Sequence, residues 1–190
     1  DRLFKSFNVA DIAKASLSKN QERRKQRTSR EIIPTITTKQ NLYDLQVMDV
    51  WIGIDIYETY LKYFNRPTAD LADPRLIDLI DEAISLLIYW QDYFDETNVA
   101  AVVLDADAYM YQNILAKVAY TRDVPVYLPG LMEIIRADMP HPRYVSLFDR
   151  YREFFDKLSP AEQTDGIALA KLQLSRRLNG ELSVDQYSSK

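Results

Sequence analysis

The sequence contains no cysteine and a single histidine among its 190 residues. The absence of cysteine excludes disulfides, thiolate metal sites and cysteine nucleophiles, and one histidine cannot build the imidazole clusters that hold zinc. Glycine is also scarce, with four residues, and neither a G-x-G-x-x-G motif nor a phosphate-binding loop is present. Such glycine-rich motifs usually hold dinucleotides and nucleoside triphosphates, so we expect no organic cofactor in this chain. The lack of cysteine and of a second histidine leads us to expect no metal either.

Long apolar runs and an excess of positive charge are absent as well. No stretch approaches the roughly 18 apolar residues that a transmembrane helix needs, and the first residues lack the pattern of a signal peptide, so we expect a cytoplasmic protein. The formal net charge is −4, whereas nucleic-acid-binding domains are usually basic, so we expect no nucleic-acid partner. The chain starts with aspartate rather than methionine, and we expect it to be a piece of a longer polypeptide.

What is present is the composition of an ordinary globular domain, with 47% hydrophobic and 27% charged residues. Apolar residues at helical spacing predict helices over 6–30, 49–64, 109–120, 146–157 and 160–178, and an aspartate followed by proline predicts a further helix that begins at Pro74. Short apolar runs predict strands over 99–104 and 124–128, and residues 32–38 read as an edge strand or an extended connector.

The strand, helix and strand between residues 99 and 128 are typical of a βαβ unit. The unbroken apolar run 99–104 predicts a parallel strand that is buried on both faces. The predicted fold class is therefore α/β, rich in helix, with a small parallel, Rossmann-like sheet that has helices on both faces. We expect an N-terminal helix and connector over 1–38, the α/β domain over 39–182 and a polar tail over 183–190.

Two aspartates directly follow the first predicted strand, in the sequence Asp105-Ala-Asp107-Ala-Tyr109. Ligands of open α/β sheets bind at the carboxyl ends of strands, and two carboxylates at such an edge can bind a hard cation or the hydroxyls of a sugar. This interpretation makes Asp105 and Asp107 candidate catalytic residues and Tyr109 a candidate substrate-binding residue. The structural alternative is that Asp107 caps the following helix and Asp105 accepts hydrogen bonds from backbone amides.

A second candidate site lies at the start of the helix predicted over 49–64. Glycine inside a helix costs about 1 kcal/mol relative to alanine, so Gly53 indicates a close approach of another part of the chain. Asp55 and Tyr57 follow within the first turns, where a carboxylate also interacts favourably with the helix dipole. We expect Gly53, Asp55 and Tyr57 to contribute to substrate binding; the alternative is an aromatic core stripe with a dipole-stabilising aspartate.

His141 is flanked by Pro140 and Pro142. A lone histidine in a loop is usually structural or exposed, but an imidazole can also act as a general base, so His141 is kept as a substrate-binding candidate.

Five cations crowd the end of the first predicted helix, namely Arg23, Arg24, Lys25, Arg27 and Arg30. Cations suit the negative end of a helix dipole, so a solvated helix end explains them without any ligand. The alternative is contact with an anionic glycan, a nucleotide or a membrane surface. We expect any peripheral association with the inner face of a membrane to use Arg23, Arg24, Lys25 and Arg27.

Several short blocks carry a resemblance to a known family. In order and spacing they resemble the N-terminal half of bacterial capsule and surface-carbohydrate biosynthesis proteins, which are similar to glycosyltransferases with two Rossmann domains (GT-B). The blocks are Ile52-Gly-Ile-Asp-Ile-Tyr-Glu-Thr-Tyr-Leu-Lys62, Pro67-Thr-Ala-Asp-Leu71, Trp90-Gln-Asp-Tyr-Phe94, the run 99–104 with Tyr109, Ile114-Leu-Ala-Lys-Val-Ala119, Val124-Pro-Val-Tyr127 and Ser175-Arg-Arg-Leu-Asn-Gly180.

The resemblance implies that this chain holds a saccharide acceptor, and that a C-terminal half outside this sequence holds the nucleotide-sugar donor. It implies that Asp105, Asp107 and Tyr109 line the acceptor side of the cleft together with Asp55 and Tyr57, and that one aspartate deprotonates the acceptor hydroxyl. The family often has Ser-His before this tyrosine, where this chain has Asp105-Ala-Asp107. Either an aspartate has taken over as the base, or the activity is lost; the fragment alone is expected to be inactive.

Two other functions are compatible with the sequence. Asp105-Ala-Asp107 also resembles the D-x-D element of single-domain GT-A glycosyltransferases, which binds manganese and the donor diphosphate. That fold needs several strands upstream of the motif, whereas residues 1–98 are predicted to be mostly helical. The third possibility is a non-catalytic scaffold of a polysaccharide assembly complex, since tyrosine is abundant and aromatic residues are enriched in protein interfaces.

Overall fold

The computed structural model describes residues 15–106, 108–129, 134–137 and 151–181 and divides the chain into two compact units, Asp1–Leu147 and Phe148–Lys190. This boundary lies inside the predicted domain 39–182, and the helix of the predicted segment 1–38 belongs to the first unit. The second unit contains α7 (Tyr151–Asp156) and α8 (Pro160–Leu178). The first unit contains α2 (Lys19–Ile32), the 3-10 helix η1 (Ile33–Thr35), α3 (Lys39–Tyr43), β1 (Gln46–Val47), β2 (Val50–Trp51), α4 (Gly53–Phe64), α5 (Pro74–Glu96), β3 (Val102–Val103), α6 (Tyr109–Tyr120), β4 (Val126–Pro129) and β5 (Ile134–Ala137).

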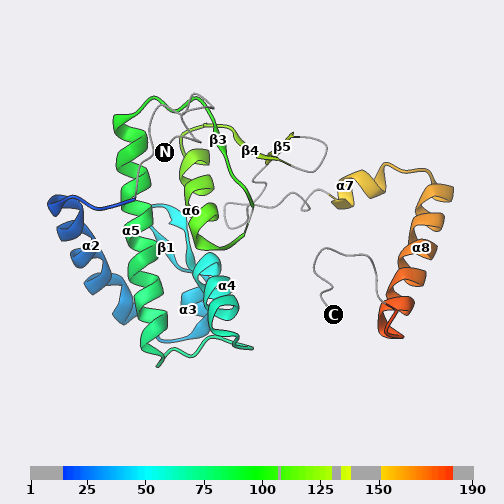
Figure 1. Ribbon diagram of the computed structural model, residues 1–190, viewed down its shortest axis with the longest axis horizontal. Coiled ribbons are helices and arrows are strands. Elements are labelled where there is room, and N and C mark those ends of the chain that lie inside the picture. The colour runs from blue at the N-terminus through cyan, green and yellow to red at the C-terminus, as the bar shows by residue number, and fades with distance from the viewer. Residues whose placement is uncertain (1–14, 107, 130–133, 138–150, 182–190) are drawn as a thin grey trace, which may run out of the picture. The chain divides into compact units, whose positions relative to one another are not determined.

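The long helix α5 is the centre of the first unit (Figure 1), with α2 packed against one side and α4 and α6 against the other. Its start is the predicted one: Asp73 is the N-cap and accepts a hydrogen bond from the amide of Arg75, and Pro74 is the first helical residue. The Tyr60 hydroxyl donates to Asp73 at 2.7 Å, which ties α4 to this corner. The main core consists of apolar side chains from α3, β1, β2, α4, α5 and one face of α6.

A two-stranded ribbon precedes α4, so the prediction of a helix from residue 49 is wrong at its start. β1 pairs antiparallel with β2 around Met48 and Asp49, which both have left-handed backbone angles (φ 49° and 64°). Such angles suit a two-residue hairpin loop. The apolar residues of this stretch, which fit a helix in spacing, are therefore divided between a hairpin and the helix that follows it.

The sheet of the first unit has the order β3-β4-β5 and is mixed. β3 and β4 are parallel, as predicted, and the predicted helix α6 forms the crossover between them, whereas β5 pairs antiparallel with β4. β3 spans only two residues, and Val103 is 68% exposed, so the prediction of a strand buried on both faces is wrong. Beneath the sheet, Ala116 and Ala119 of α6 pack against apolar side chains of all three strands.

The N-terminal part differs from the prediction in two places. Residues 15–18 are not helical, and α2 begins at Lys19 with Ser18 as the N-cap of a capping box. The prediction of one continuous helix over 6–30 is therefore wrong. Ile33–Thr35 form a 3-10 turn with Pro34 near its start, where the missing amide hydrogen is tolerated, and the predicted edge strand is wrong.

In the second unit, α8 has the predicted bounds, with Ser159 as its N-cap. Of the helix predicted over 146–157, the structure shows α7 over Tyr151–Asp156. The tail 183–190 lies outside the described residues. None of the described helices is both long and apolar enough to cross a membrane.

Candidate functional site

An open groove of about 620 Å³ lies between α4 and the start of α6. We call it the α4–α6 groove. It is adjacent to the loop that follows β3, on the carboxyl side of a parallel strand, where α/β proteins usually bind ligands. Its lining combines charged, amide and aromatic side chains: Glu58, Leu61 and Lys62 from α4 with its C-cap Asn65, and Tyr109 from α6 with its N-cap Ala108.

Tyr109 is held in a conformation that its side chain disfavours. Its φ angle is +63°, in the left-handed region that bulky residues rarely adopt. The preceding N-cap residue, Ala108, has no side chain to cap α6. A threonine of α4 replaces that cap: the amide of Met110 donates to Thr59 Oγ1 at 3.0 Å, and the Thr59 hydroxyl donates to the carbonyl of Asp55 at 2.6 Å. Thr59 therefore fixes the position of Tyr109 in the groove.

A buried ion pair joins α4 and α6 next to this cap. Lys117 Nζ lies 2.5 Å from Asp55 Oδ2 and 2.8 Å from the carbonyl oxygen of Trp51, and Asn113 Nδ2 donates to Asp55 Oδ1 at 3.0 Å. Both charged side chains are almost completely excluded from water. Desolvation raises the pKa of Asp55 to about 6, against the opposing pull of Lys117, and desolvation lowers the pKa of Lys117.

Glu58 lies one turn along α4 from Asp55 and lines the groove. The residue is exposed, but the surroundings of its carboxyl group desolvate it and raise its pKa, although the charge of Lys117 acts in the opposite direction. A groove-lining carboxylate with a raised pKa holds a proton more strongly, and is a stronger base, than an ordinary glutamate.

The structure brings only part of the predicted site together. Tyr109 lines the groove, whereas Asp105 is exposed in the bend after β3 and accepts a hydrogen bond from the Gln112 side chain at 3.3 Å. Asp105 therefore folds back over the first turns of α6, and a side chain replaces the backbone amides expected as its partners. Asp107 and His141 lie outside the described residues.

The three candidates on α4 have separate environments. Asp55 belongs to the buried ion pair, so it could contact a solute only if its pairing with Lys117 were broken. Tyr57 packs edge-on against Tyr43, with its hydroxyl 3.3 Å from Thr68 Oγ1. Gly53 confirms the predicted close approach, because a Cβ there would lie 1.9 Å from the carbonyl oxygen of Leu42.

Sequence reasoning missed Glu58, Thr59, Lys62, Asn113 and Lys117. Two signals point to all of them except Glu58. Asp55, Thr59 and Lys62 are spaced i, i+4, i+7 on one side of α4. Asn113 and Lys117 stand four residues apart between buried apolar residues of α6, and polar groups on an apolar helix face need a buried partner.

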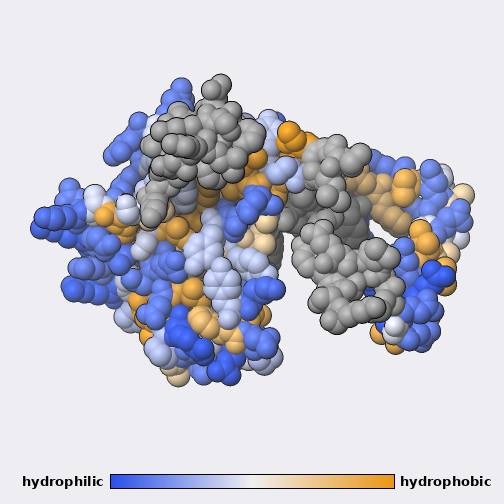
Figure 2. Space-filling view, viewed as in Figure 1, coloured by the Kyte–Doolittle hydropathy of each residue, from blue (hydrophilic) through white to orange (hydrophobic). Residues whose placement is uncertain are grey.

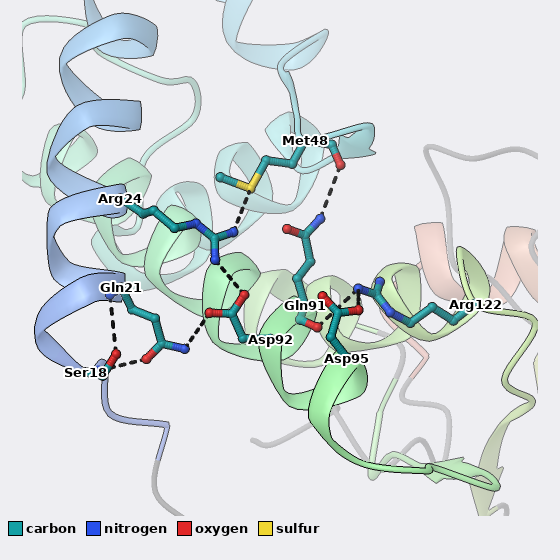
Figure 3. A network of polar contacts seen from close by, with 8 residues as sticks. All are labelled: Ser18, Gln21, Arg24, Met48, Gln91, Asp92, Asp95 and Arg122. Carbon is teal, nitrogen blue, oxygen red and sulfur yellow. Dashed lines mark hydrogen bonds and ion pairs between the residues drawn. The ribbon is translucent and has the colours of Figure 1, made fainter.

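The basic cluster of α2 is divided by its contacts. Arg24 pairs with Asp92 of α5 at 2.6 Å (Figure 3). Lys25 pairs with Asp81 of α5 at 3.0 Å. Gln21 also donates to Asp92, and Ser29 donates to Asp81. These residues attach α2 to the core, so Arg24 and Lys25, two of the four cations expected to meet a membrane, already have partners within the chain.

No group of three or more His, Asp or Glu side chains within the described residues comes close enough together to hold a metal ion. Comparison with protein-family models, with curated proteins and with solved structures finds no match to this chain.

Proposed function

We propose that this chain is the acceptor-binding half of a glycosyltransferase-like protein of bacterial surface-polysaccharide synthesis, and that the α4–α6 groove holds the saccharide acceptor. The observation that carries the proposal is the groove itself, which combines hydrogen-bonding side chains with an aromatic residue beside the loop after β3. The donor nucleotide sugar belongs to a second, C-terminal half. A Rossmann-like arrangement with helices on both faces of the sheet is part of the same proposal.

The lining of the groove matches the chemistry of a sugar. Lys62 and Asn65 supply donors for hydroxyl oxygens, Glu58 supplies acceptors for hydroxyl hydrogens, and the Tyr109 ring supplies an apolar face for the C–H groups of a pyranose. The left-handed backbone of Tyr109, held by Thr59, positions this ring before the ligand arrives. Such preorganisation reduces the entropy that is lost on binding.

Glu58 is the residue of the groove best suited to be the general base. In the transfer step its carboxylate accepts the proton of the acceptor hydroxyl, while the acceptor oxygen bonds to the anomeric carbon of the donor and the nucleoside diphosphate leaves with the bonding electrons. The raised pKa of Glu58 makes it a stronger base than an ordinary glutamate. Asp105, the base expected from the sequence, is exposed next to this groove and is the second candidate.

The GT-A alternative receives less support. The secondary structure described between residues 15 and 98 consists of helices and one two-stranded ribbon. The nucleotide-binding strands that a GT-A fold needs upstream of its D-x-D element are missing from that part of the chain.

Saturation-transfer and heteronuclear NMR with the methyl glycosides of glucose, galactose, N-acetylglucosamine and rhamnose test the proposal on this chain. At least one glycoside should shift the amides of Glu58, Lys62 and Tyr109. Lys62→Ala should weaken that binding, and Glu58→Gln should largely preserve it because glutamine keeps the size and an acceptor oxygen. Asp78→Asn, which removes an exposed carboxylate of α5 outside the groove, is the matched control.

The absence of shifts at the groove for all four glycosides would refute the proposal. Equal weakening by Lys62→Ala and Asp78→Asn would also count against it, since a change outside the groove would then act as strongly as a change within it.

A further inference from the structure

One face of α2 carries a row of cations that the protein does not use internally. Lys19, Arg23, Arg27 and Arg30 are all exposed, and none forms an ion pair or hydrogen bond with a described residue. At about 100° per residue these four positions fall within roughly 80° of the helix circumference, and they extend over about 16 Å. We call this row the basic stripe.

The stripe points away from the core. Thr28 and Ser29 are buried, and Arg24 and Lys25 reach the carboxylates of α5 from the opposite side of the helix. The stripe residues Arg23, Arg27 and Arg30 line a shallow depression of about 340 Å³ together with Gln26 and Glu31. In the space-filling view the surface over α2 is strongly hydrophilic (Figure 2).

We infer that the basic stripe binds the surface of a membrane that contains anionic lipids. The charge supports this occupant: the chain as a whole carries a net charge of −4, yet four cations gather here, where Glu31 lines the same depression. The other carboxylate of α2, Glu22, is paired with Lys25. Salt screens charges beyond about 8 Å under physiological conditions, so the acidic remainder of the molecule does not cancel the local field. Clustered basic residues are attracted to anionic lipid head groups in this way.

The shape of the stripe favours a lipid surface over a nucleic acid. A straight row of cations on a convex helix can meet a flat array of phosphates along its whole length. Helix α2 contains no aromatic residue on which a base could stack. The net negative charge of the chain also disfavours a long polyanion that would face more than this one side.

Flotation of the whole chain with lipid vesicles tests the inference. Binding to phosphatidylcholine vesicles that contain one third phosphatidylglycerol should be clear at low salt, weaker at physiological salt, and absent with pure phosphatidylcholine. The triple variant Arg23→Gln, Arg27→Gln, Arg30→Gln should lower the partition coefficient on the order of a hundredfold, since each basic residue near an anionic surface contributes about fivefold.

The matched control removes the same number of charges from α8, as Lys171→Gln, Arg176→Gln and Arg177→Gln, and should bind vesicles like the unmodified chain. A second pair separates the two sets of cations on α2: Arg23→Gln with Arg27→Gln should lose binding, and Arg24→Gln with Lys25→Gln should keep it. The thermal midpoint of each variant shows whether α2 remains folded.

Three results would overturn the inference. They are equal binding to neutral and anionic vesicles, equal loss in the α8 control, and displacement from vesicles by a DNA duplex at matched phosphate concentration. The last result would assign the stripe to a nucleic acid instead.

Discussion

Two helices of the first unit are attached to the core by ion pairs, and the two attachments differ in their exposure to water. Arg24 and Asp92, between α2 and α5, have 37% and 21% of their side-chain surface exposed, whereas Lys117 and Asp55, between α6 and α4, have 1% and 2%. A water-exposed pair is screened by salt and contributes little. A buried pair is costly to form, and it is far more costly to leave half-formed. Losing one partner of the α2–α5 pair should therefore change the stability of the fold only slightly, whereas losing one partner of the α4–α6 pair should destabilise it strongly.

The largest expected effect follows from breaking the buried pair on one side. Lys117→Met leaves the Asp55 carboxylate without its cation, and Asp55→Ala leaves the Lys117 ammonium without its anion. Each single change should lower the free energy of unfolding by about 3–5 kcal/mol, measured by urea denaturation at neutral pH.

Replacing both partners sharpens this prediction. In Asp55→Asn with Lys117→Met no charge remains buried, and an amide oxygen still accepts from Asn113. The double variant should be more stable than either single variant. Additive losses would mean that the pair is not the coupled unit that the geometry suggests.

The pH dependence of Lys117→Met gives the second prediction. Burial keeps the pKa of Asp55 higher in the folded chain, about 6, than its ordinary 3.8. The folded state therefore binds more protons, and this contribution to stability is complete below about 3.8 and is lost as the pH rises through 6. Lys117→Met removes the charge and the hydrogen bond that lower the pKa of Asp55. In the variant, stability should therefore continue to fall with rising pH beyond 6. The stability gap between variant and wild type should narrow as the pH falls from 7 to 5; a constant gap would contradict the assignment.

A smaller effect is expected at Thr59, which caps α6 from α4. Thr59→Val keeps the shape of the side chain but leaves the buried amide of Met110 without its acceptor, at a cost of about 1–3 kcal/mol. Hydrogen exchange of the Met110 amide should accelerate, and binding of any glycoside in the α4–α6 groove should weaken. Thr59→Ser, which keeps the hydroxyl, is the control and should retain the protection of that amide.

The smallest effect is expected at the exposed attachment. Arg24→Ala removes the pair with Asp92 and a contact with the sulfur of Met48, and should cost less than about 1 kcal/mol at low salt. The difference between variant and wild type should shrink further in high salt, because exposed charges are screened. A loss as large as that of Lys117→Met would erase the distinction between the two attachments.

The elements that the sequence predicts best are those with local start signals. Asp73-Pro74 and Ser159-Pro160 give the starts of α5 and α8, and the strand–helix–strand spacing gives α6 and the parallel pairing of β3 with β4. The hairpin before α4 was not predicted, because its apolar residues fit a helix as well as a ribbon. The exposure of Val103 could not be predicted either, since an apolar run does not reveal which faces of a short strand are covered.

The candidate site was predictable only in part for the same reason. The position of Tyr109 follows from the strand end and the helix start, both of which are local. The pairing of Asp55 with Lys117 joins residues 62 positions apart, and nothing in the sequence around either residue indicates which residue is its partner. Glu58 looks like any exposed glutamate of a helix, and its raised pKa depends on the surroundings that folding creates.

The close approach at Gly53 has a consequence for the ancestry of this fold. The carbonyl of Leu45 accepts the amides of both Ile52 and Gly53, and a methyl group at position 53 would overlap the carbonyl of Leu42. Any protein that inherits this corner is therefore restricted to glycine there, however far the rest of its sequence has drifted. A glycine at the first turn of a helix, directly after a tight hairpin, is thus a marker by which distant descendants of the same ancestor can be recognised.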